Sequence, residues 1–233
     1  MKRSEFIEKI LEIYSPVSVL SRKNGCEVLR LRNKQNGNDL VFRSLPRSLS
    51  AYERLQNLRC ENLSEIYDVF EMEDGQIVLE EYIDGITVAQ VMEIDKYRPS
   101  GARKVLSGVC CALEALHKRG IVHRDVKPEN VMIEKTGRVV LIDFNASRVQ
   151  SDANKDTVIM GTVGYVAPEQ LGLSQTDART DIYSAGVLYN VMLTGQHPSV
   201  DMASGKAGRI IRKCTAINPD ERYQTAKELG EAL

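Results

Sequence analysis

Alternating apolar and polar positions occupy the first third of the chain and predict β-strands. Residues 17–45 read as strands separated by turns at 23–25 and 36–39. Residues 65–83 read as two more strands joined at 73–75. The pattern therefore predicts a sheet built from consecutive strands.

One short helix is expected among these strands. Residues 49–59 place Leu55 and Leu58 on an inward face. The first 83 residues are therefore predicted to form a sheet with one helix.

After Gly85 the apolar residues follow a helical period. Residues 100–119 place apolar side chains three and four positions apart, and Gly120 is a natural stop. Residues 181–194 are mostly apolar, which predicts a helix buried on most sides. Two more helices are expected at residues 206–217 and 224–233.

This change of pattern predicts an α+β fold with two lobes, in one domain that spans residues 1–233. The small lobe, residues 1–83, is rich in strands, and the larger lobe, residues 84–233, is helical. The segment at residues 81–85 is the expected hinge. A chain of 233 residues is long enough for such an arrangement.

The composition is ordinary for a globular protein, with 42% hydrophobic and 27% charged residues. The formal charge of −1, from 31 Lys and Arg against 32 Asp and Glu, argues against broad binding of nucleic acid or anionic membranes. No apolar run approaches the roughly 20 residues that cross a bilayer, and the charged N-terminus does not resemble a signal peptide. The chain is expected to be soluble as given, although it could be part of a longer membrane protein.

The five cysteines show no metal-ligand spacing. Cys110 and Cys111 lie within the helical pattern of residues 100–119, where structural thiols are expected. Free thiols suggest a reducing compartment, so a cytoplasmic location is predicted.

Candidate metal-binding residues lie at the two ends of a predicted hairpin. Residues 131–134 and 138–142 are strand-like and are joined by a turn that contains Gly137. A hairpin brings its two ends together, with strands about 4.8 Å apart, so Asn130 before the first strand should lie beside Asp143 after the second. Amide and carboxylate oxygens suit Mg²⁺, which takes few protein ligands and shares its other positions with water and phosphate.

Two charged residues lie in the loop that enters this hairpin. Asp125 offers a carboxylate for a substrate hydroxyl, and Lys127, beside the stiff Pro128, offers a cation for phosphate. Phosphoryl transfer needs positioning and charge neutralisation more than covalent chemistry. Together with the two metal ligands, these residues predict a phosphoryl-transfer site.

These segments resemble the motifs of eukaryotic-type Ser/Thr protein kinases, in particular the short bacterial members. The likeness covers roughly residues 17–233, and the motifs occur in the family's order, which is far more specific than any one of them. The matching segments are His123-Arg124-Asp125 with Asn130, Asp143-Phe144-Asn145, Ala167-Pro168-Glu169, Asp181–Gly186, and Arg222.

The resemblance implies a bilobal kinase fold with an ATP cleft between the lobes, and transfer of the γ-phosphoryl group of ATP to Ser or Thr hydroxyls of a protein. It makes Asp125 the catalytic base or hydroxyl orienter and brings Lys127 to the γ-phosphate. Asn130 and Asp143 would hold Mg²⁺, or alternatively Mn²⁺. Further nucleotide contacts implied by the resemblance are Val28, Val41, Arg43, Glu80, Glu81, Ile83 and Met132.

Other matching residues have supporting roles in the family. His123 and Phe144, with Leu55 and Ile66, resemble the apolar stack that links the lobes. Thr162 resembles the threonine that packs beside the catalytic Asp and Lys.

Two arginines resemble family residues that bind acidic groups. Arg222 resembles the arginine that pairs with the Glu of Ala-Pro-Glu. Arg124 would pair with a phosphorylated residue, for which Thr157 and Ser151 are candidates. The alternative is that both candidates are solvated loop residues.

The predicted phosphate-covering loop departs from the family. Ser21, Lys23 and Cys26 stand where its three glycines are expected. Backbone amides approach phosphate most closely where side chains are absent, so this loop should cover ATP less tightly.

The expected Lys–Glu ion pair is also altered. Arg43 replaces the lysine, and Ala51 stands near the place of its glutamate. Glu53, two residues away, points elsewhere on the helix unless a small register shift restores it as the partner. Glu80, at the position that guards the back of the adenine pocket, needs a partner, and Arg43 is the candidate that we consider. Asn145 replaces the glycine of Asp-Phe-Gly, and Asn tolerates positive φ well enough for the turn to survive.

Three functions fit these observations. An active Ser/Thr kinase is favoured by the four catalytic groups, whereas a pseudokinase that binds nucleotide or acts as a scaffold is favoured by the altered small lobe. A small-molecule phosphotransferase is disfavoured by Ala167-Pro168-Glu169 and Gly161-Thr162, which belong to a peptide-substrate platform. The segment between Gly195 and Ala207 is short for the family, so substrate docking is expected to be simple or to lie outside this chain.

Overall fold

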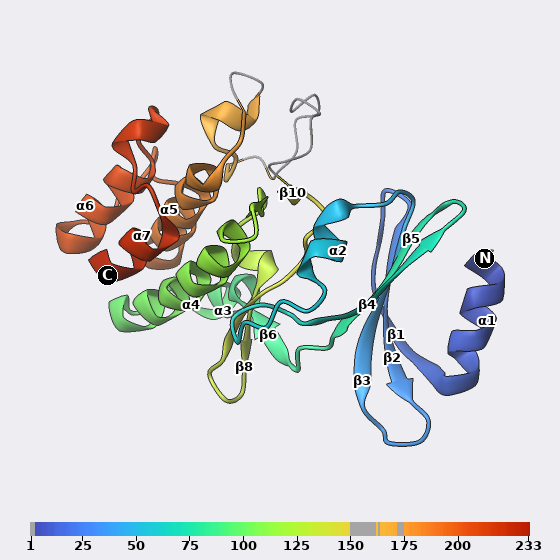
Figure 1. Ribbon diagram of the computed structural model, residues 1–233. Coiled ribbons are helices and arrows are strands. Elements are labelled where there is room, and N and C mark those ends of the chain that lie inside the picture. Colours follow the sequence, from blue (N-terminus) through green and yellow to red (C-terminus); the bar gives the residue numbers. More distant parts are fainter. Residues whose placement is uncertain (1–2, 150–161, 163, 172–174) are drawn as a thin grey trace. The chain divides into compact units, whose positions relative to one another are not determined.

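A computed structural model describes residues 3–149, 162, 164–171 and 175–233, so the candidate phosphorylation sites Ser151 and Thr157 lie outside the described residues. The chain forms two compact units (Figure 1). Unit 1 comprises residues 1–59 and 64–83, and unit 2 comprises residues 60–63 and 84–233.

Unit 1 is built on a five-stranded antiparallel sheet with the order β1-β2-β3-β5-β4. The predicted turn at residues 23–25 is a two-residue hairpin in which Asn24 and Gly25 have φ of 52° and 74°, as such tight turns require. The strands are β1 (Tyr14–Lys23), β2 (Cys26–Asn33), β3 (Asp39–Leu45), β4 (Ile66–Met72) and β5 (Gly75–Glu81).

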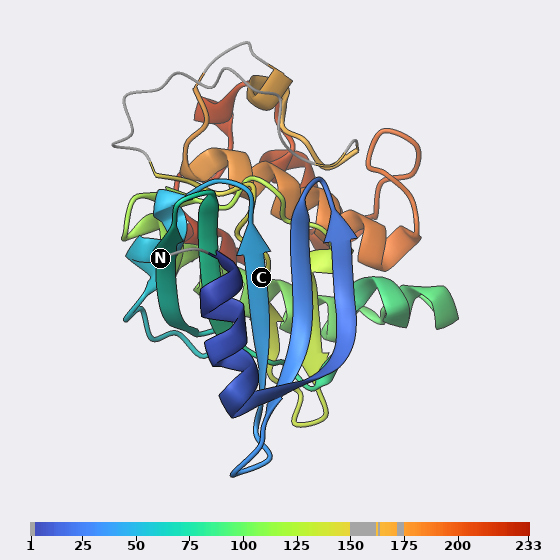
Figure 2. The ribbon, with the colours of Figure 1, turned by 90° about the vertical axis from the view of Figure 1, so that its right-hand side faces the viewer.

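A helix that the sequence analysis did not predict, α1 (Arg3–Ile13), covers one face of this sheet (Figure 2). Phe6 and Ile10 from α1 pack against buried apolar side chains of the strands, among them Leu31 and Phe42. The described residues of unit 1 therefore form two helices rather than one, because the amphipathic N-terminal segment buries its apolar side on the sheet.

The predicted helix at residues 49–59 is shorter than expected. Helix α2 (Ser50–Leu55) ends where Gln56 takes an extended ψ of 129° and Asn57 takes a positive φ of 68°. Leu55 is buried as predicted, whereas Leu58 is only half-buried.

Unit 2 is mainly helical. Its two longest helices, α4 (Pro99–His117) and α5 (Ala178–Thr194), pack together and are followed by Gly120 and Gly195, both with positive φ. The predicted helices near the C-terminus begin or end within a few residues of the expected bounds. The remaining helices are α3 (Val88–Ile94), α6 (Gly205–Cys214) and α7 (Ala226–Ala232).

Unit 2 also contains short paired strands next to its loops. β7 (Ile121–Val122) pairs with β10 (Arg148–Val149), and β8 (Val131–Glu134) pairs with both β6 (Gly85–Thr87) and β9 (Val139–Leu141). The β8–β9 hairpin is the one that the sequence predicts. Among the residues that the structure describes, no helix combines the length and apolar character needed to span a membrane.

Candidate active site

A buried carboxylate holds the loop that carries the predicted catalytic residues of unit 2. Asp181, in the first turn of α5, accepts hydrogen bonds from the backbone N–H groups of His123 and Arg124, each at 2.8 Å. Its Oδ2 also lies 2.8 Å from Nε2 of His117. Arg124 has φ of 65°, a conformation that non-glycine residues keep only where their surroundings impose it. Asp181 therefore fixes the backbone just before Asp125.

Asp125, Lys127 and Thr162 form a closed triangle of polar contacts. Nζ of Lys127 lies 2.7 Å from Oδ2 of Asp125 and donates a hydrogen bond of 2.7 Å to Oγ1 of Thr162. The Thr162 hydroxyl donates in turn to Oδ1 of Asp125 at 2.8 Å. This confirms the predicted place of Thr162 beside the other two residues.

The same contacts set the charge of Asp125. Burial raises the pKa of this carboxyl, but the Lys127 ammonium and the Thr162 hydroxyl lower it by more, so that the pKa lies below its ordinary value. Asp125 is therefore a carboxylate at neutral pH.

Asp125 also orients the side chain of Asn130. Nδ2 of Asn130 donates to the backbone oxygen of Asp125 at 2.8 Å and to its Oδ2 at 2.9 Å. Both N–H donors of the amide then face Asp125, which leaves Oδ1 as the atom able to bind a cation.

The β8–β9 hairpin brings Asp143 to the same end as Asn130. The backbone N–H of Ile142 donates to the backbone oxygen of Asn130 at 2.9 Å, just beyond the paired strands, and Asp143 follows directly. Asp143 has φ of 66°, which is strained for a non-glycine residue and typical of functional sites. An amide oxygen and a carboxylate at one hairpin end fit the ligand preference of Mg²⁺.

The turn after Asp143 is kept despite the missing glycine. The residue of this turn that has a positive φ is Asp143. Asn145 is not among the described residues with positive φ, so the prediction that Asn145 would take this conformation is wrong. The backbone N–H of Asn145 donates to Oδ1 of Asp143 at 3.3 Å. Beside this turn, the rings of His123 and Phe144 are fully buried and meet edge to face at 5.6 Å, as half of the predicted apolar stack.

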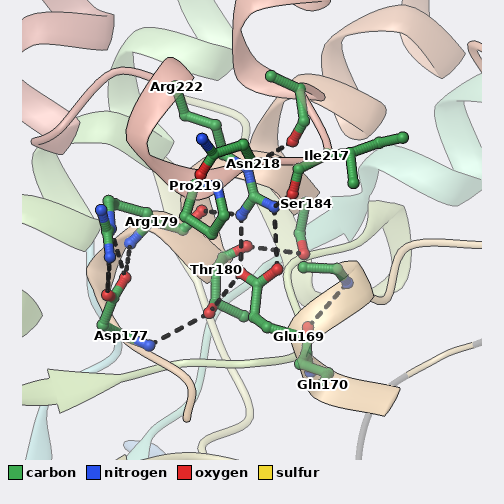
Figure 3. Close-up of polar contacts among 12 residues, drawn as sticks. Glu169, Gln170, Asp177, Arg179, Thr180, Ser184, Ile217, Asn218, Pro219 and Arg222 are labelled. Carbon is green, nitrogen blue, oxygen red and sulfur yellow. Dashed lines mark hydrogen bonds and ion pairs between the residues drawn. The ribbon is translucent and has the colours of Figure 1, made fainter. Parts of the chain in front are cut away.

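Glu169, in the Ala167-Pro168-Glu169 motif, and Arg222 form a buried ion pair in unit 2 (Figure 3). The two guanidinium Nη atoms lie 2.7 and 2.9 Å from the two carboxylate oxygens, so the pair is bidentate and is confirmed as predicted. The other N–H groups of Arg222 donate to the backbone oxygens of Ala216, Arg179 and Ile217. Burial raises the pKa of Glu169, but its bonds to Arg222 and to Thr180 lower it by more, and the net pKa falls below its ordinary value.

Three polar residues of the site were not identified as contacts from the sequence. Gln170 donates to the backbone oxygen of Arg124 at 3.0 Å, and Ser184 donates to that of Tyr165 at 2.8 Å. Asp181 was recognised only as a helix start. A signal existed for Asp181 and Ser184, since both interrupt an otherwise apolar helical stretch.

In unit 1, Arg43 and Glu80 form a buried ion pair, which confirms the hypothesis drawn from the sequence. Nε and Nη2 of Arg43 donate to Oε1 of Glu80 at 3.0 and 2.7 Å. Glu80 lies opposite Val41 in the β3–β5 ladder, so Arg43 is its diagonal neighbour on the same face. Val28 lies opposite Arg43 in the β2–β3 ladder and shares that face. Four of the predicted nucleotide contacts therefore lie together on the sheet face opposite to α1.

Helix α2 contributes an aromatic ring rather than a carboxylate near Arg43. The guanidinium carbon lies 6.0 Å from the centre of the Tyr52 ring. Ala51 is buried and Glu53 is exposed. Glu53 therefore does not replace the missing glutamate of the family.

The remaining predicted residues lie in or after short strands and in the loop before Asp125. Glu81 closes β5, where its backbone N–H donates to the oxygen of Glu65 at 2.8 Å, and Ile83 is buried. Met132 lies on β8 opposite Val140 and is half-buried. Arg124 directs Nε to the backbone oxygen of Ala146 at 2.7 Å.

Comparison with known proteins agrees with the motifs. A family model described as "Protein kinase domain" matches residues 29–232. The chain is 32% identical to "Serine/threonine-protein kinase PknB" of Mycolicibacterium smegmatis, over 72% of this chain and 32% of that protein. It is 33% identical to the protein of the same name from Mycobacterium tuberculosis H37Rv, over the same shares. It is also 32% identical to "Probable serine/threonine-protein kinase SCO3848" of Streptomyces coelicolor, over 65% of this chain and 27% of that protein. The matches thus cover about a third of the length of these relatives.

Proposed function

Because the chain belongs to the eukaryotic-type protein kinase family, we propose that it transfers the γ-phosphoryl group of ATP to Ser or Thr hydroxyls of a protein substrate. The observation that carries the proposal is the closed set of contacts among Asp125, Lys127, Thr162 and Asn130. Phosphoryl transfer needs charge neutralisation and positioning, and a carboxylate, a cation and an amide held together by these contacts support the proposal.

Asp125 is the proposed base or orienter of the substrate hydroxyl. Its lowered pKa keeps it ionised at neutral pH, ready to accept the hydroxyl proton as the oxygen attacks the γ-phosphorus and ADP leaves. The ammonium of Lys127 lies 2.7 Å from the Asp125 carboxylate, which would bind the attacking hydroxyl. Lys127 would therefore lie close enough to the transferred phosphoryl group to neutralise its charge. A lysine two residues after this aspartate is the arrangement of the Ser/Thr branch of the family.

Asn130 and Asp143 would hold Mg²⁺, or alternatively Mn²⁺. When bound with ATP, the ion would neutralise phosphate charge. The chain's own contribution is to present Oδ1 of Asn130 and the strained Asp143 at one hairpin end.

For the nucleotide, we propose contacts from Val28, Val41, Arg43 and Glu80 on the sheet of unit 1. The further proposed contacts are Glu81, Ile83, Lys127, Met132 and Asp143. Arg43 would take the role of the family lysine with Glu80 as its acidic partner, which supports an active enzyme.

The pseudokinase remains the second candidate function. It is favoured by the exposed Glu53 and the buried Ala51, which leave α2 without the carboxylate that active kinases use to position their lysine.

We further propose one kinase domain over residues 1–233, with residues 1–83 as its small lobe and residues 84–233 as its large lobe. A reducing cytoplasmic setting is supported by the five free cysteines. The partner expected from the family is a Ser- or Thr-containing protein.

A Mg-ATP assay separates these functions. The purified chain is incubated with radiolabelled ATP and Mg²⁺, first alone and then with generic Ser/Thr protein substrates, and phosphorylated sites are mapped by mass spectrometry. Asp125→Asn and Asp143→Asn should lower incorporation by at least about 10²-fold, whereas Asp201→Asn, an exposed site, should leave it unchanged.

Incorporation equal to that of Asp125→Asn, together with unimpaired nucleotide binding, would establish the pseudokinase instead. Phosphorylation of sugars or aminoglycosides in place of peptides would establish the small-molecule phosphotransferase.

A further inference from the structure

Helix α6 presents an unusual distribution of charge. Its ten residues include Lys206, Arg209, Arg212 and Lys213 and no acidic residue. Its buried side is formed by apolar residues and Gly208. All four cations therefore lie on the solvent side of the helix, in a chain whose formal charge is only −1.

A groove runs along this basic side. Arg209, Arg212 and Lys213 line it together with the apolar side chains of Met202 and Ile217, and this shallow, open groove has a volume of about 540 Å³. Ile217 is 81% exposed, so its side chain is accessible to a partner. The groove thus combines positive charge with an exposed apolar contact.

Two of the groove cations have no acidic partner in the part of the chain that the structure describes. Arg209 and Arg212 form no hydrogen bond or ion pair there, and Lys213 lies 4.3 Å above the ring of Tyr223. Arg22, another exposed arginine, pairs with Glu27.

The spacing of these cations is unfavourable for the helix. Arg209 lies three residues before Arg212 and four before Lys213, so that like charges neighbour one another on the helix surface, an arrangement that destabilises a helix. Interaction with the helix dipole accounts for Arg212 and Lys213, which lie in the last turn, but not for Arg209.

We propose that the groove along α6 is a docking site for an acidic segment of a partner protein, with Asp or Glu side chains at Arg209, Arg212 and Lys213 and an apolar side chain against Ile217. Charge complementarity supports this occupant, because carboxylates would supply the partners that the cations lack. The single carboxylate in the groove wall, Glu221, would lie at the edge of such a segment.

A peptide fits these features better than a nucleic acid or a lipid surface. The cations line one local site together with the apolar side chains of Met202 and Ile217, rather than forming the extended basic surface that a phosphate backbone requires. The proposal uses no residue of the phosphoryl-transfer site, so it stands or falls independently of the proposed function.

Direct binding tests the proposal in the absence of ATP. A fluorescein-labelled peptide with six Glu residues flanking one Leu is titrated with the full chain, and anisotropy is recorded at low and at physiological salt. We expect saturable binding that Arg209→Glu/Arg212→Glu weakens at least tenfold. The neutral variant Arg209→Gln/Arg212→Gln should weaken it by a smaller factor, and it guards against misfolding of the charge-reversed protein.

The matched control is Lys9→Glu/Arg103→Glu, which makes the same change in total charge at exposed sites on α1 and α4. It should bind the peptide like the original chain. Equal binding by all variants would overturn the proposal. It would also be overturned if a single-stranded oligonucleotide or phosphatidylserine vesicles bound more tightly than the peptide with the same dependence on Arg209 and Arg212.

Discussion

Arg43 donates two hydrogen bonds to Oε1 of Glu80, and the two residues lie on neighbouring strands of one sheet. In typical protein kinases the corresponding cation pairs with a glutamate on a helix, whose position controls activity. Here Ala51 occupies the expected place on α2 and is buried. The acidic partner of Arg43 therefore lies on a neighbouring strand of the sheet, and α2 contributes the Tyr52 ring near the guanidinium.

Replacing the carboxylate of this pair should affect both stability and nucleotide binding. Glu80→Gln removes the carboxylate of this buried ion pair with Arg43, and breaking such a pair costs about 3 kcal/mol of unfolding free energy. We expect this loss in urea denaturation, together with weaker binding of a fluorescent ATP analogue. Glu53→Gln, at the exposed alternative on α2, should change neither quantity. Unaltered nucleotide affinity in Glu80→Gln would rule out its role at the nucleotide.

Helix α1 should contribute strongly to the stability of unit 1. The Phe6 ring lies in the apolar cluster on the sheet, with its centre 4.5 Å from that of Phe70. Phe6→Ala should therefore lower the free energy of unfolding by about 3 kcal/mol in urea. Leu11→Ala, on the exposed side of the same helix, should cost well under about 1 kcal/mol. Similar losses for the two variants would show that α1 is not held by this cluster.

The features that the sequence predicted correctly are mostly local. The β8–β9 hairpin follows from alternating side chains around a glycine turn, and this alone brings Asn130 and Asp143 to one end. The pair of Glu169 and Arg222 is a long-range contact, but it could be predicted because both residues lie in recognisable motifs.

The features that it missed depend on contacts distant in the chain. The amphipathic pattern of α1 did not indicate which surface would bury it, and that surface comes from four strands. Helix α2 ends because Gln56 takes an extended backbone conformation. The order of apolar and polar residues in 49–59 does not predict this change. The hydrogen bonds from the backbone N–H groups of His123 and Arg124 to Asp181 could not be predicted without knowing how α5 packs beside the loop.

Asp181 should control the rate of phosphoryl transfer without touching substrate. Asp181→Asn keeps the size of the side chain but offers only one acceptor oxygen, so its amide must face one of the two backbone N–H groups now bound. The loop before Asp125 would shift, and a misplacement of about 1 Å can cost on the order of 10² in rate. We expect kcat to fall by that factor while KM for ATP changes little. An equal rise in KM with constant kcat would contradict this positioning role, and Asp201→Asn is the control.

The ion pair of Glu169 and Arg222 should make stability depend on acidity. Because the pKa of Glu169 in the folded protein is lowered below its ordinary value of 4.5, the pair stabilises the fold above that pH and loses its contribution as the pH falls through the folded-state pKa. Glu169→Gln cannot lose a charge. It should be less stable than the original chain by about 3 kcal/mol at pH 7, and this difference should shrink as the pH is lowered towards 3. Urea denaturation at a series of pH values measures both curves, with Glu231→Gln, an exposed site, as the control that follows the original chain. A difference that stays constant from neutral to acidic pH would mean that Glu169 is not the group whose ionisation stabilises the fold.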